Sequence, residues 1–151
     1  MKQIISLFLV SILSACAALP AQTPTPTVGA PFVIKQEENP YEPRTEDVNM
    51  KQDDITITSL SLSERYDLTP LRAELHILGS MPNVCSELRI KVNSPTNEYK
   101  INIDAYGVSD LKLKCENVFQ QFNTTILLGV YSAGQYTVWV NDILAGTLAS
   151  Y

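Results

Sequence analysis

The sequence has little positive charge. Eleven Lys and Arg residues stand against 16 Asp and Glu residues, which gives a formal net charge of −5. Proteins that bind DNA or RNA concentrate basic side chains on one surface, and no segment of this chain contains such a cluster. The composition therefore argues against a nucleic-acid partner.

The residues that usually carry enzyme chemistry are also scarce. His76 is the sole histidine, and the sequence has no zinc-ligand spacing, G-x-S-x-G elbow, phosphate-binding glycine loop or calcium loop. His76 falls on the polar positions of a predicted strand, beside Glu74. Glu87, Glu98 and Asp104 fall on outward strand positions, so we interpret them as solubilising charges rather than as a glycosidase pair. The sequence predicts no catalytic residue, no metal site and no cofactor.

No apolar run has the length of a membrane-spanning helix, which needs about 20 residues. The segment IISLFLVSIL at residues 4–13 follows the positive charge of Lys2 and has the length of a signal-peptide hydrophobic region. Leu13-Ser14-Ala15-Cys16 closes it. This tetrapeptide resembles the lipobox of bacterial lipoprotein precursors.

The lipobox resemblance implies a signal peptide over residues 1–15, cleavage before Cys16, and a diacylglycerol on that cysteine. An added acyl chain such as palmitate would give stable anchoring. The protein would then lie in the bacterial cell envelope, held by lipid to a membrane outside the cytoplasm. An ordinary secretory signal is the alternative, because Ala15-Cys16-Ala17 also fits an A-x-A cleavage site.

Residues 16–54 have the composition of a linker. Six of the nine prolines lie here, in AQTPTPT and around the acidic stretch KQEENPYEPRTED. Proline and like charges keep a chain extended and solvated. We therefore expect a flexible linker between the lipid and a folded domain. The alternative is that residues 32–34 and Tyr41 dock on that domain.

From residue 55 the apolar residues alternate with polar ones, which indicates β-strands. No segment has helical periodicity. The shift of apolar phase near Ser59 predicts a bulge. Several short antiparallel strands, each with one apolar face, predict an all-β sandwich of about seven to eight strands over residues 55–151. The expected strands are 55–62, 71–78, 87–93, 98–106, 110–115, 122–131, 135–141 and 143–150.

Cys85 and Cys115 lie in this domain and would form a disulfide in an exported protein. Metal binding together with His76 is the alternative. The patterns G-x-M-P-x-x-C (79–85), C-x-x-x-x-x-x-F (115–122) and G-x-Y-x-V-x-V-N (134–141) resemble a domain found in bacterial lipoproteins. That resemblance covers most of residues 71–151 and implies an immunoglobulin-like sandwich with this disulfide. It implies no activity.

One aromatic residue breaks the core pattern. Tyr136, Val138 and Val140 share the core phase of their strand, so Trp139 is predicted to point the other way. Tyr106 is likewise on the polar phase of its strand. Because exposed tryptophan is a common anchor in interfaces, we predict that Trp139, with Tyr106, contacts an envelope protein or a glycan. The alternative is that residues 32–41 or a neighbouring loop covers Trp139.

Taken together, these features favour a lipid-anchored binding module over an enzyme. The second interpretation is a peptidase inhibitor that presents loops to a protease cleft, and the third is an enzyme of unidentified type. The loops considered for the inhibitor are 79–85, 107–110 and 132–135.

Overall fold

The alternating segments of the sequence form strands. The computed structural model describes residues 29–151, so the predicted signal peptide and Cys16 lie outside the described residues. The strands are β1 (Val33–Lys35), β2 (Lys51–Asp53), β3 (Thr56–Arg65), β4 (Arg72–Met81), β5 (Glu87–Val92), β6 (Lys100–Ser109), β7 (Gln120–Leu127), β8 (Val130–Tyr131), β9 (Gly134–Val140) and β10 (Ile143–Ser150), and a 3₁₀ turn, η1, spans Thr45–Asn49.

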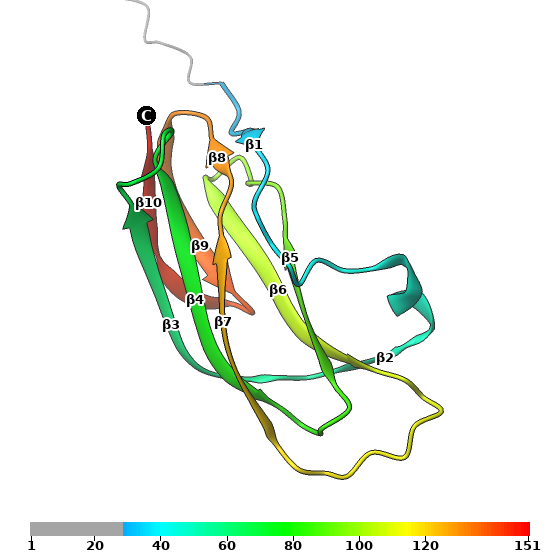
Figure 1. Cartoon of the computed structure of the whole chain (residues 1–151). Helices are drawn as coiled ribbons and strands as arrows, with labels where there is room; N and C mark the ends of the chain where they lie inside the picture. The colour runs from blue at the N-terminus through cyan, green and yellow to red at the C-terminus, as the bar shows by residue number, and fades with distance from the viewer. Residues whose placement is uncertain (1–28) are drawn as a thin grey trace, which may run out of the picture.

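Two sheets face each other across one apolar core (Figure 1). One sheet has the order β3-β4-β7, and the other has the order β10-β9-β6-β2 with β5 also paired to β6. A small sheet of β1 and β8 lies at one end. The predicted all-β sandwich is confirmed. The pairing differs from the antiparallel expectation at one place, because β6 and β9 are parallel.

The core follows the predicted alternation. Inward side chains of β4, β6 and β9 are almost fully buried, among them Leu75, Ile77, Ile101, Ile103, Tyr136, Val138 and Val140. The register between β3 and β4 shifts between Ile57 and Ser59, which confirms the predicted bulge. Each sheet thus has one apolar face, and burying these two faces together is the main source of stability.

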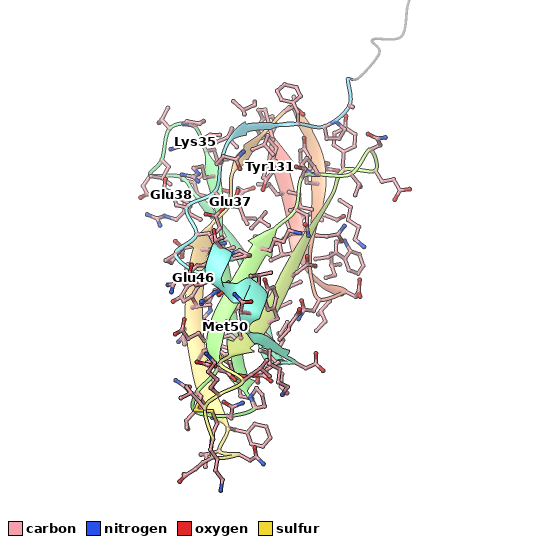
Figure 2. The ribbon with its side chains drawn as sticks, turned by 90° about the vertical axis from the view of Figure 1, so that its right-hand side faces the viewer. Lys35, Glu37, Glu38, Glu46, Met50 and Tyr131 are labelled. Carbon is pink, nitrogen blue, oxygen red and sulfur yellow. A yellow bond between two sulfur atoms is a disulfide. The ribbon has the colours of Figure 1, made fainter. Side chains whose placement is uncertain are left out.

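The predicted flexible linker is wrong from residue 33 onward. Residues 33–53, which we call the strap, lie along the sandwich: β1 pairs with β8, Glu38 pairs with Leu127, and β2 pairs with β6. Figure 2 shows the strap with Lys35 and Glu38 near one end of the sandwich and Met50 further along it. The cause is burial, because Tyr41 packs against the core and offsets the cost of ordering the chain.

The first anchor of the strap is a buried arginine. Arg72 is 3% exposed and its Nη1 lies 2.5 Å from Glu38 Oε1. Its Nη2 also donates to the carbonyl oxygen of Gln36 at 3.1 Å, and its Nε donates to the carbonyl oxygen of Leu128 at 2.9 Å. The hydrogen bond from Arg72 holds the pKa of Glu38 below its usual value. One guanidinium therefore joins the strap to the chain after β7.

The second anchor is Arg89 on β5. Its Nε and Nη2 donate to the two carboxylate oxygens of Asp47, at 2.7 and 2.9 Å. The side chains of Arg89 and Asp47 are only 3% and 10% exposed. Such a bidentate pair fixes direction as well as distance. The hydrogen bonds from Arg89 lower the pKa of Asp47. Neither charge would be tolerated at this depth without the other.

Asp53 makes stability depend on pH. Burial alone would raise its pKa, but hydrogen bonds from Lys51, Ser109 and Ser86 outweigh burial and lower the pKa from 3.8 to about 2. The unfolded chain therefore takes up this proton first, so the stabilisation is present above about pH 4 and is lost as the pH falls toward 2. We expect a loss of about 2 kcal/mol from this group.

Urea unfolding at pH 6, 4 and 2.5 measures the effect. The Asp53→Asn variant should lose less free energy of unfolding across this range than the wild type does. The Asp54→Asn variant, altered at an exposed neighbour, is the control and should keep the wild-type slope. Equal slopes for Asp53→Asn and the wild type would contradict the assignment.

Candidate functional site

A disulfide joins two loops at one end of the sandwich. Cys85 and Cys115 are bonded, with 5.8 Å between their Cα atoms. The bond links the β4–β5 loop to the β6–β7 loop, residues 110–119. The disulfide expected from the sequence is thus present in the structure. Among residues 29–151, no group of three or more His, Cys, Asp and Glu side chains is placed to hold a metal ion.

The strand predicted at residues 110–115 is wrong, because this segment is part of the loop. The Asp110 side chain accepts a hydrogen bond from the backbone N–H of Lys112 at 2.8 Å, and its carbonyl accepts one from the N–H of Leu113 at 3.1 Å. This local turn satisfies groups that a strand would pair elsewhere. The disulfide at Cys115 then directs the chain toward the β4–β5 loop.

The two linked loops expose a group of apolar side chains, which we call the apolar tip. Each of its five members is more than half exposed, and Phe119 is 72% exposed. They are Val84, Leu111, Leu113, Val118 and Phe119. The 110–119 loop lies at the end of the sandwich opposite β1 and the C-terminus (Figure 1). The sequence does not reveal this surface, because the Leu-Lys-Leu-Lys alternation of residues 111–114 predicts a strand with a buried face.

Trp139 lies on the outer face of the five-stranded sheet, as its phase predicted. It is half-buried, whereas Tyr136, Val138 and Val140 on the same strand are fully buried. The Nζ atom of Lys100 lies 4.6 Å from the centre of the indole ring, within the range of a cation–π contact. The indole Nε1 is buried and has no hydrogen-bond partner among the described residues.

A hollow of about 350 Å³ adjoins Trp139. Its polar lining consists of the Lys100 ammonium group and of amide and carboxyl groups. The residues with these amide and carboxyl groups are Asn93, Asn102, Asp104, Asn141 and Asp142. No residue of the strap lines this hollow. The lining of this hollow therefore gives no support to the alternative that residues 32–41 cover Trp139.

Tyr106 is placed differently. It lies on the same outer face, in register with Arg89, and shares a hollow with Glu37, Glu42 and Pro43 of the strap. Burial raises the pKa of Tyr106. On β6, Trp139 is paired with Asn102. Asn102 precedes Tyr106 by four residues, which is about 13 Å along a strand. The structure therefore does not gather the two predicted binding residues into one cluster.

The titratable residues considered for catalysis are also apart. Glu87 and Asp104 face Val108 and Lys91 respectively, which places them four positions apart along β5, about 13 Å. Glu87 pairs with Arg89 at 3.0 Å. His76 contacts Asn123 on the outer face of the other sheet. The geometry brings no carboxylate pair and no nucleophile–base pair together at these residues.

Of the three loops considered for a peptidase inhibitor, two adjoin the tip. Residues 79–85 and 107–110 lead into the disulfide-linked loops, whereas 132–135 lies beside β1, where Ser132 donates its N–H to Phe32. The three loops therefore do not form one inhibitory surface.

The comparison with known proteins gives a match to the sandwich and none to the strap. Residues 75–149 match the family model of the ORF11 beta-sandwich domain. The match begins inside β4, includes both bonded cysteines, ends inside β10 and leaves out the strap. No curated protein and no solved structure matches the chain. Within residues 29–151, no helix is both long and apolar enough to cross a bilayer.

Proposed function

We propose that this protein is a lipid-anchored protein of the bacterial envelope and that it acts as a non-catalytic binding module. Its contact surface is the apolar tip. The observation that carries this proposal is the exposure of five large apolar side chains on two loops held together by a disulfide. Concentrated exposed apolar surface on a soluble domain commonly marks an interaction site.

The position of the tip fits an anchored protein. The described chain enters at the β1 end, and the tip lies at the opposite end (Figure 1). A lipid on Cys16 would therefore hold the sandwich from the end remote from the tip. The tip then faces away from that membrane, where a second protein has access to it.

The chemistry of the tip favours a protein partner. The 110–119 loop carries two acidic residues, Asp110 and Glu116, and two basic residues, Lys112 and Lys114. Their charges cancel, so the loop has no net attraction for an anionic polymer or an anionic lipid surface. The binding free energy would come mainly from burying apolar side chains.

Photo-crosslinking in intact cells tests the contact. A photoreactive amino acid at position 113 should give one discrete protein adduct, whereas the same residue at Lys91, exposed on β5, is the matched control and should give none. Phe119→Asp should remove the adduct at position 113. Adducts of equal strength at both positions would refute the tip as the contact surface.

The intact mass of the protein extracted from the membrane should show a lipid adduct on a chain that starts at Cys16.

A glycan at Trp139 is a second candidate, favoured by the half-buried ring beside amide and carboxyl groups. Trp139 is the sole tryptophan, so its fluorescence reports directly on this site. A tetramer of N-acetylglucosamine should shift the emission in a saturable way, and Asn102→Ala should weaken that titration about fivefold through the loss of one hydrogen bond. Emission that ignores the sugar at millimolar concentration would eliminate this candidate.

A further inference from the structure

The outer edge of β7 is unprotected along most of its length. Among the described residues, β7 pairs with β4 on one side and with Glu38 alone on the other. The strand, QQFNTTIL, contains no proline and no charged residue. Edge strands of soluble proteins usually carry such residues to prevent pairing with another chain. This edge lacks them.

The strap shows which backbone groups face outward. Leu127 donates its N–H to the carbonyl of Glu38 at 3.1 Å and accepts the N–H of Glu38 at 2.8 Å. Outward groups alternate along a strand that is paired on its other side, and the pairing of β4 with β7 has no register shift. The N–H and C=O groups of Gln121, Asn123 and Thr125 therefore face outward as well.

A hollow lies beside this free edge. It has a volume of about 350 Å³ and lies between β7, the start of β5 and the strap. Its apolar floor includes Met81, Leu88 and Phe122. The partly exposed pair of Arg44 and Glu87, at 3.7 Å, lies at its rim. Such a hollow has room for an apolar side chain.

One polar group in this hollow has no partner within residues 29–151. Thr124 lines the hollow and is 4% exposed, and its buried Oγ1 makes no hydrogen bond to any of these residues. An unsatisfied buried hydroxyl is costly, so its presence calls for an explanation. A ligand that brings a hydrogen-bonding group into the hollow would satisfy it.

The strap already demonstrates how an extended chain occupies this side of the sandwich. Glu38 pairs with β7, and three residues later the carbonyl of Tyr41 accepts the N–H of Ile90 on β5 at 2.8 Å. The side chain of Asn39 donates to the carbonyl of Ile90 at 2.6 Å. The strap then turns away into η1. The slot between β7 and β5 continues beyond it as the hollow.

We propose that the edge of β7 from Gln121 to Thr125 binds an extended peptide of a partner protein. The peptide adds as a strand antiparallel to β7, in continuation of the pairing made by Glu38. One of its side chains enters the hollow and brings apolar surface and a hydrogen-bonding group to Thr124, as a tyrosine or threonine would. This site is distinct from the apolar tip and does not depend on it.

The probe for this site is a display library of random dodecapeptides, selected on the full mature chain in detergent. The selected peptide is synthesised and titrated by calorimetry. Asn123→Pro removes one outward N–H and should weaken binding at least tenfold. Thr124→Val should weaken it about fivefold while raising the Tm by about 4 °C, because the unsatisfied hydroxyl is gone. Thr125→Ala is the matched control and should bind as the wild type does, since the backbone makes the contacts.

Hydrogen exchange locates the peptide. Binding should protect the amides of Asn123 and Thr125, and N-methylation of the peptide at alternate positions should abolish binding, which holds even if Asn123→Pro fails to fold. The proposal is overturned if no peptide is selected, if protection falls on the tip instead, or if Thr124→Val and the methylated peptides bind normally. A wild-type dimer that Thr125→Lys disrupts would overturn it in favour of a second copy of this chain.

Discussion

A chain that begins at residue 55 is expected to unfold, even though the alternating strands begin there. Removing the strap separates the guanidinium of Arg89 from Asp47 and deprives Arg72 of Glu38 and of the Gln36 carbonyl. Removing one partner of a buried ion pair costs about 3–5 kcal/mol. The loss of β2 and of the Tyr41 contact with the core adds to this. The total stability of a domain is only about 5–15 kcal/mol.

Circular dichroism and urea unfolding of four chains measure this effect. The reference is a chain that starts at Cys16. A chain that starts at Gly29 is the control and should keep the urea midpoint of the reference. A chain that starts at residue 55 should lack a cooperative transition at 25 °C. Arg89→Ala in the reference chain should lower the free energy of unfolding by about 3–5 kcal/mol. A cooperative transition at the control's midpoint in the shortest chain would show that the strap is not needed.

Replacing both bonded cysteines with alanine should lower the free energy of unfolding by about 3–4 kcal/mol. Cys85 and Cys115 are 30 residues apart in the sequence, and the bond restricts the unfolded chain over that distance. The large apolar side chains of the two loops face solvent and do not pack into the core. The native tip should therefore also become less ordered.

Urea unfolding of Cys85→Ala/Cys115→Ala gives the first quantity, and amide exchange of residues 110–119 gives the second. Treating the wild type with a reductant is the matched control and should reproduce both effects. A loss below about 1 kcal/mol, with unchanged exchange in the loop, would mean that the loops are fixed by other contacts.

The strands of the sandwich were largely predictable, because alternation is a local signal. β4, β5, β6, β9 and β10 all begin and end within three residues of the expected ranges. The strap was not predictable in this way. β1 and β2 have three residues each, too few for a pattern, and the prolines and charges around them resemble those of a linker. What orders them is distant in sequence: Arg72 and Arg89 donate hydrogen bonds to carboxylates that lie more than 30 residues earlier.

The candidate sites divide in the same way. The outward orientation of Trp139 follows from strand phase, so the sequence sufficed. The exposure of Leu113 and Phe119 is a tertiary property, because it depends on which strand is available to cover them. The free edge of β7 is also a tertiary property, because the sequence of a single strand does not determine which other strands pair with it. The one local signal for the tip was the Asp110 turn, which stops the chain from continuing as a strand.

The packing of the strap also sets how far the protein reaches. Because the carbonyl of Gly29 already accepts a hydrogen bond from Tyr99 of the sandwich, the proposed lipid on Cys16 would be joined to the body by only the 13 residues from 17 to 29. Fully extended, they span at most about 45 Å. The ten residues of β4 add a length of about 33 Å. The tip would therefore meet only partners within about 80 Å of the anchoring bilayer, so the gap between envelope layers would decide which proteins it encounters.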